Sequence, residues 1–183
     1  MPRLTVVDPA NATGKAKELF DGPLKGKHLN IFKGMANSPA ALEFYLNGSG
    51  ALAGASLSAK EQEVVQLVFA QANKCDYCQA AHTAIGKGAG LTEDQTIAAR
   101  TQGDLGDAKL TAIAAFAGAL FEKRGFVSDD DIQAFKSAGY DDGAVAEIIA
   151  VSALATYTNY FNHVNETEVD MPTPPAVSAQ TTG

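Results

Sequence analysis

The sequence has few cysteines and little positive charge. Two cysteines in 183 residues exclude a small disulfide scaffold, which needs several bridges in place of a core. Lysine and arginine number 14 against 21 aspartates and glutamates, so the formal net charge is -7, and no dense basic cluster offsets it. Such a charge repels phosphate backbones and anionic lipid surfaces. We therefore expect neither nucleic acid nor a membrane as a partner.

Long apolar runs are also missing. The first residues, from Met1 to Pro9, contain no uninterrupted apolar stretch of the length that a secretory signal needs. The longest apolar run, from Leu110 to Phe121, falls short of the roughly 20 residues that span a bilayer, and it predicts a buried core helix. These absences predict a cytoplasmic protein.

Helix signals, by contrast, recur along the chain, and no stretch shows the sustained alternation of half-buried strands. Capping boxes begin at Ser58 and Thr92, and Asp107 and Asp141 can cap further helices. The 46% of apolar residues is enough to fill one core. The expected helices cover residues 13–20, 39–46, 59–71, 74–87 and 108–123, one after each of residues 92 and 128, and 142–164.

These signals predict an all-α, single-domain helical bundle over residues 1–166. After Glu166 the sequence becomes polar and proline-rich, so residues 167–183 are expected to form a flexible C-terminal tail. Between the third and fourth helices, residues 72–74 make a short link, and Asn73 is the expected cap of the helix from about Lys74.

The two cysteines stand close together, at Cys75 and Cys78. A disulfide between them would close a very small loop and so would stabilise the fold little. This favours a use of the pair in reversible redox chemistry. In a helix from Lys74, both cysteines and His82 would fall within an arc of roughly 60° on one face. Cys78 and His82 are four residues apart, the spacing at which helical side chains meet. The segment therefore predicts a thiol site with an imidazole beside it.

Thiol chemistry needs a thiolate, and a free cysteine is only about 3% ionised at pH 7. Splitting a peroxide also requires a proton for the departing alkoxide or hydroxide. Glu63 lies one helix earlier, and partial burial would let its carboxyl exchange protons near neutrality. Packed antiparallel across the link, the two helices could bring Glu63 to His82, which would pass protons to sulfur.

The spacing Glu-x11-Cys-x2-Cys-x3-His, from Glu63 to His82, resembles the active-site motif of the alkylhydroperoxidase D family within the carboxymuconolactone decarboxylase superfamily. All four positions match, and the segment 159–163 is similar to bacterial proteins described only at superfamily level. The resemblance implies an all-helical fold that assembles into homo-oligomers, often trimers or hexamers. It implies no bound cofactor beyond a reversible Cys75–Cys78 disulfide.

The resemblance also implies residue roles. Peroxide would oxidise Cys78 to a sulfenic acid, Cys75 would act as proton donor and resolving thiol, and His82 with Glu63 would form the proton relay. Family members can receive electrons from lipoylated proteins and pass them to a peroxiredoxin. The helix dipole, however, acts most strongly on the more N-terminal Cys75, so electrostatics alone could favour that thiolate.

One position departs from the family pattern, and it bears on the choice of substrate. Tyr77 stands where some members have a histidine that joins the relay, and a tyrosine shuttles protons poorly at neutral pH. Disulfide exchange would then be the main chemistry in place of hydroperoxide reduction.

Other interpretations of the same residues stay open. A zinc site could use both cysteines and His82, but no fourth ligand is evident. Decarboxylation of a carboxylated lactone would need no cysteine pair. A non-enzymatic redox sensor would use the same pair. His163 is expected to be an ordinary histidine at a helix end.

Overall fold

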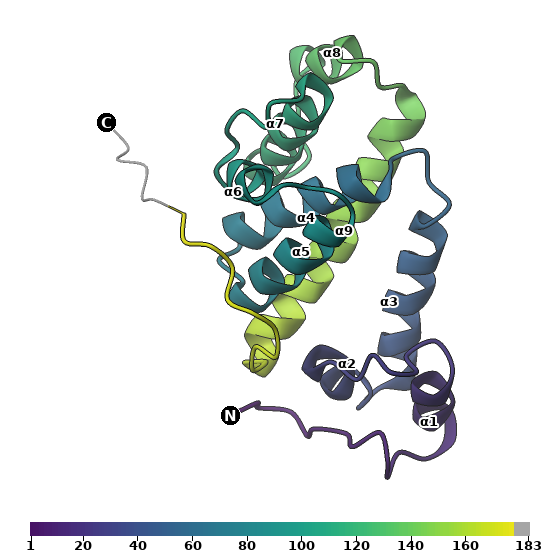
Figure 1. The fold of residues 1–183 in the computed structure, drawn as a ribbon. Coiled ribbons are helices and arrows are strands. Elements are labelled where there is room, and N and C mark those ends of the chain that lie inside the picture. Colours follow the sequence, from purple (N-terminus) through teal and green to yellow (C-terminus); the bar gives the residue numbers. More distant parts are fainter. Residues whose placement is uncertain (178–183) are drawn as a thin grey trace.

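The computed structural model describes residues 1–177, and the regular structure of that part consists of nine α-helices (Figure 1). In chain order they are α1 (Gly14–Asp21), α2 (Asn30–Met35), α3 (Pro39–Leu52), α4 (Ala59–Ala72), α5 (Asp76–Gly88), α6 (Glu93–Thr101), α7 (Ala108–Glu122), α8 (Asp129–Ser137) and α9 (Asp142–Asn165). The predicted all-α class is confirmed for the described residues. None of these helices is both long and apolar enough to cross a membrane.

Six of the nine helices in the described residues begin at a serine, threonine or aspartate whose side chain accepts a free amide of the first turn. Ser58 Oγ accepts a hydrogen bond from the Glu61 amide, and the Glu61 carboxylate accepts one from the Ser58 amide, which confirms the capping box of α4. Asp107 and Asp141 cap α7 and α9 as predicted. Helix α3 continues six residues beyond the expected end at Leu46, to Leu52, and α2 was not predicted.

Helix α4 lies at the centre of the fold. It packs against α5, α6, α7 and α9, and α4, α5 and α9 run side by side in Figure 1. One core cluster is formed by residues of α4, α6, α7, α8 and α9. In it, Phe135 stacks between Phe116 and Tyr140. Ile113 and Ala117 are fully buried there, as expected for the apolar run in α7.

A second core cluster joins the N-terminal helices to the start of α5. Phe20 of α1, Met35 of α2 and Leu42 of α3 are buried in the same cluster as Cys75 and Cys78. The two cysteines therefore belong to a core that a segment remote in sequence completes.

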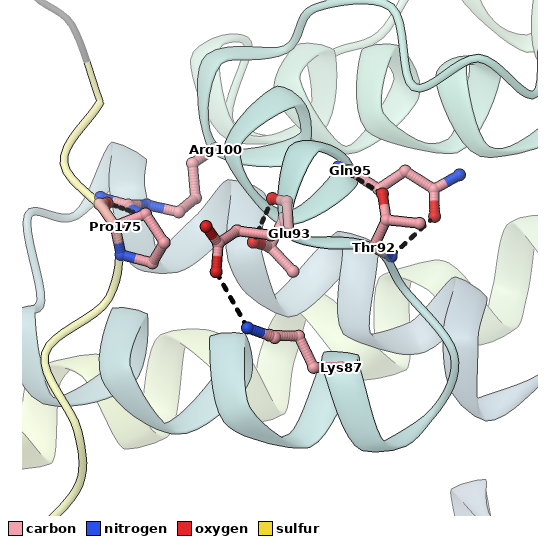
Figure 2. A network of polar contacts seen from close by, with 7 residues as sticks. Lys87, Thr92, Glu93, Gln95, Arg100 and Pro175 are labelled. Atoms are coloured by element: carbon pink, nitrogen blue, oxygen red, sulfur yellow. Dashed lines mark hydrogen bonds and ion pairs between the residues drawn. The ribbon is translucent and has the colours of Figure 1, made fainter.

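The segment after α9 has no regular structure up to residue 177, but it contacts the helices. The Asp170 carboxylate accepts hydrogen bonds from the Asn30 amide (2.7 Å) and the Tyr77 hydroxyl (2.9 Å). Further on, the Arg100 guanidinium donates to the carbonyl oxygen of Pro175 (2.6 Å; Figure 2). Residues 178–183 of the expected flexible tail lie outside the described residues, and the boundary at 166 stays a prediction.

Candidate active site

The start of α5 differs from the sequence prediction. Asn73 does not cap this helix: it ends α4, and its side-chain amide donates to Asn159 Oδ1 (2.9 Å). Lys74 then takes a left-handed backbone conformation (φ 55°), and Cys75 becomes the N-cap, with its sulfur accepting the Cys78 amide at 3.2 Å. The prediction was wrong because the Asn73 side chain binds α9 instead of the amides of α5.

Because α5 begins after Cys75, the two cysteines do not both lie on one helical face with His82. Cys75 is extended (φ -90°, ψ 97°), so its direction does not follow from helical periodicity. Cys78 and His82 both lie within α5, four residues apart, and so retain the predicted spacing on one face.

Cys75 and Cys78 are joined by a disulfide in this structure. Their Cα atoms are 5.3 Å apart, within the range usual for such bonds. Both residues are buried, with 1% and 2% of their surfaces exposed. A redox partner of the pair must therefore reach sulfur through an opening, since neither residue lies on the open surface.

Glu63 of α4 and His82 of α5 lie in direct contact. Glu63 Oε2 is 2.8 Å from His82 Nδ1, and about one eighth of each side chain is exposed. Gly86 of α5 lies beside this pair and beside Leu91: a Cβ there would be in ordinary contact with Glu63 Cβ (3.5 Å) but would lie 2.9 Å from Leu91 Cδ1, so a side chain at position 86 would displace Leu91.

The Glu63 contact occupies Nδ1 of His82 and fixes the orientation of the imidazole, so Nε2 is the nitrogen left for proton transfer. Among the described residues no hydrogen bond joins His82 to either sulfur in the disulfide state. The role of the pair as a relay stays a prediction.

Asn162 belongs to the site, although the sequence reasoning gave it no role. Its Nδ2 donates a hydrogen bond to Cys78 Sγ at 3.3 Å, and only 4% of the residue is exposed. The sequence held a signal for it: Asn159, Asn162 and Asn165 recur every three residues of α9 and are all buried. Buried amides at helical spacing mark a face that must bind polar groups elsewhere in the fold.

A cavity of about 470 Å³ lies between the start of α5 and the end of α9. Cys75, Tyr77 and Asn162 line it, together with His163, which is exposed. Cys78 is not among its lining residues. The cavity therefore borders the Cys75 side of the disulfide.

Tyr77 lies between the two cysteines, at the position where a histidine could have joined the proton relay. Its hydroxyl donates to Asp170 Oδ1 (2.9 Å) and accepts from the Ile31 amide (3.4 Å). Burial, and then the hydrogen bond to the Asp170 carboxylate, raise the pKa of Tyr77 well above its ordinary value. The phenol thus keeps its proton at neutral pH and ties three segments together.

Metal chemistry was considered for the cysteines and His82. Within residues 1–177, no three histidine, cysteine, aspartate or glutamate side chains are grouped so that they could hold a metal ion.

Comparison with solved structures identifies the fold. An uncharacterised peroxidase-related protein from Ralstonia eutropha JMP134, described as an alkylhydroperoxidase AhpD core, is 20% identical with a TM-score of 0.81, covering 92% of each chain. A peroxidase-related protein from Silicibacter sp. TM1040 is also 20% identical, with a TM-score of 0.77 over 91% of this chain and 89% of that one. A cysteine-to-alanine variant of the debrominase Bmp8, in complex with 2,3,4-tribromopyrrole, is 17% identical, with a TM-score of 0.75 over 93% and 94%.

Sequence comparisons add the family. No curated protein matches the sequence significantly. Residues 39–120 match the model of the carboxymuconolactone decarboxylase family, and this range contains Glu63, both cysteines and His82. The segment that carries the four predicted site residues thus matches the carboxymuconolactone decarboxylase family, and the chain has the fold of an alkylhydroperoxidase AhpD core.

Proposed function

We propose that the protein is a thiol-dependent peroxidase or disulfide oxidoreductase in which Cys75 and Cys78 cycle between dithiol and disulfide. The observation that carries the proposal is a disulfide between these residues, one helical turn from a histidine held by a carboxylate. The peroxidase-related proteins of the same fold agree with this chemistry.

In the peroxidase reaction, the Cys78 thiolate attacks the terminal oxygen of a hydroperoxide. The O–O bond breaks, Cys78 becomes a sulfenic acid, and an alkoxide leaves. The Cys75 thiol then displaces the sulfenic hydroxyl as water and forms the disulfide. In total the dithiol loses two electrons and two protons, and the hydroperoxide becomes an alcohol and water.

His82 and Glu63 would supply the proton that this step needs. A protonated imidazole can donate from Nε2 to the departing alkoxide, while Glu63 holds the other ring nitrogen and stabilises the charged ring. Because lowering a thiol pKa also lowers its nucleophilicity, a thiolate alone gives only a small gain in rate. The proton relay would therefore account for most of the acceleration.

The disulfide must be reduced again for turnover. A dithiol such as the lipoyl group of a lipoylated protein could do this, and a peroxiredoxin could take electrons from the reduced pair. A cytoplasmic location suits such cycling, since thiols there are kept reduced. Assembly into a trimer or hexamer is part of the same proposal.

Two other functions predict different results for the same protein. Lactone decarboxylation would release carbon dioxide without any change in the thiols. A non-enzymatic redox sensor would form the disulfide once, with no turnover above that of free cysteine, and would change its assembly on oxidation.

The experiment mixes reduced protein with an alkyl hydroperoxide in stopped flow and counts free thiols by mass spectrometry. Loss of two thiols, with a Cys75–Cys78 bond and a rate well above that of free cysteine, supports the proposal. The same assay with a low-molecular-weight disulfide, and with a brominated pyrrole, tests which electron acceptor is preferred. If the thiols survive all three, the proposal fails.

A further inference from the structure

We propose that Asn162 is a further catalytic residue, whose side-chain amide holds the Cys78 sulfur and favours the dithiol over the disulfide. This inference rests on the proposed redox function and deepens it. It places a residue of α9, 84 positions along the chain from Cys78, in contact with a reacting sulfur atom.

In the disulfide form, only one of the two polar atoms of the Asn162 side chain has a hydrogen-bond partner within residues 1–177. Nδ2 donates to Cys78 Sγ, but Oδ1 is buried and has no partner among the described residues. A disulfide sulfur is neutral and cannot donate, whereas a thiolate is a charged acceptor and a thiol can donate to an oxygen. Both reduced forms of Cys78 thus satisfy this amide better than the disulfide does.

The neighbours of Asn162 hold it in place. Asn159, one turn earlier on α9, binds Asn73, and Asn165, three residues later, binds the Leu4 amide at 3.0 Å and Thr167 Oγ1 at 2.9 Å. These contacts fix α9 against both the link before Cys75 and the N-terminal segment. The Asn162 amide therefore meets sulfur in a prearranged position, which favours electrostatic stabilisation of a charge formed there.

The cavity indicates the order of events in reduction. Because Cys75 and not Cys78 is among the residues that line the cavity, we assign the attack of an incoming thiolate to Cys75 Sγ, which forms a mixed disulfide while the Cys75–Cys78 bond breaks. Cys78 leaves as the thiolate, onto the Asn162 amide. When the reductant is a dithiol, its second thiolate releases Cys75, so the reductant becomes a disulfide and the protein gains two electrons. A leaving thiolate that is better stabilised departs faster.

The test measures the equilibrium of the full chain with mixtures of reduced and oxidised dithiothreitol, by counting thiols. We expect Asn162→Ala to shift the equilibrium about tenfold toward the disulfide, which corresponds to about 30 mV. Asn162→Asp keeps the shape but places a carboxylate beside the thiolate, so its shift should be larger. Thr158→Ala, the matched control, removes a buried polar group one turn before Asn162, whose hydrogen bonds stay within α9, and should behave as the wild type.

A second readout follows the ultraviolet absorbance of the thiolate in the reduced protein as pH changes. Asn162→Asp should need a higher pH than the wild type to form a thiolate at the cysteine pair, and Thr158→Ala should not. Circular dichroism checks that each variant is folded. If Asn162→Ala does not fold, the comparison with the wild type uses Asn162→Asp, whose side chain has nearly the same shape.

The proposal is overturned if Asn162→Ala matches the wild type, or if Thr158→Ala shifts as far, because the effect would then belong to helix packing. Neither readout uses a peroxide. A wild type whose thiols react with none of the three acceptors faster than free cysteine would therefore refute the proposed function and leave the role of Asn162 in the equilibrium standing. An active enzyme with an unshifted Asn162→Ala would do the reverse.

Discussion

Helices α4 and α5 are neighbours of nearly equal length, yet their first turns are built from different atoms. Ser58 begins α4 with an oxygen cap: its Oγ accepts the Glu61 backbone amide at 3.3 Å, and the half-buried Glu61 carboxylate accepts the Ser58 backbone amide at 2.8 Å. Cys75 begins α5 with a buried sulfur, a weaker acceptor. The first arrangement stabilises a helix, whereas the second places a reactive atom at the positive end of a helix dipole.

The same comparison bears on which sulfur reacts. Cys75 receives the Cys78 amide at the helix start, which would favour a thiolate there. Cys78 receives a donor of its own from Asn162 on α9. The dipole alone therefore does not decide in favour of Cys75, and the proposed role of Cys78 as the residue that peroxide oxidises agrees with its own donor.

The largest effect is expected from removing the sulfur within α5. Cys78→Ser should lower peroxide turnover at least about a thousandfold, because a hydroxyl is not ionised at neutral pH and cannot form the disulfide. Stopped-flow measurement of peroxide consumption checks this. Full turnover by this variant would contradict the assigned role of Cys78.

Helix α4 contributes one group to the proposed chemistry, so Glu63→Gln should have the next largest effect. Loss of the carboxylate leaves His82 without its charged partner, and we expect peroxide turnover to fall about tenfold to a hundredfold with the fold intact. Thermal unfolding and the rate assay are compared on one preparation.

The matched control for Glu63→Gln is Glu93→Gln. Glu93 is exposed and pairs with Lys87 at 2.9 Å (Figure 2), a contact of small energetic value at the surface. Equal losses in the two variants would mean that net charge, and not the contact with His82, governs turnover.

The start of α4 should affect stability alone. Ser58→Ala removes the capping hydroxyl and should lower the free energy of unfolding by about 1 kcal/mol, with peroxide turnover unchanged. Urea denaturation measures the first quantity. Under reducing conditions Cys75→Ser, which replaces the sulfur cap by an oxygen cap, should not lower stability in the same way, and a similar loss would refute the contrast between the two helix starts.

A helix start could be predicted from the sequence where the capping side chain is of a usual type. Ser58, Thr92, Asp107 and Asp141 carry oxygens that sequence rules recognise, and their helices begin where expected. A cysteine is not among the usual caps, so the start of α5 was placed at Asn73 instead.

Contacts between distant segments explain the remaining differences. Helix α2 has six residues and no side-chain hydrogen bond at its cap, Leu29, so no start signal marked it. The contacts of Asn162 with Cys78 and of Asn159 with Asn73 depend on how α9 packs, which local patterns do not contain.

The smallest effect is expected at Tyr77, which lies within the first turn of α5 between the two cysteines. Tyr77→Phe removes the hydrogen bonds to Asp170 and Ile31 but keeps the buried ring, so we expect a loss of about 1 kcal/mol in the free energy of unfolding. Peroxide turnover should change less than about twofold, because a phenol with a raised pKa exchanges no protons at neutral pH. Urea denaturation and the stopped-flow assay measure the two quantities. A large loss of turnover with normal stability would instead place the phenol in the relay, and the first turn of α5 would then hold a third reactive group.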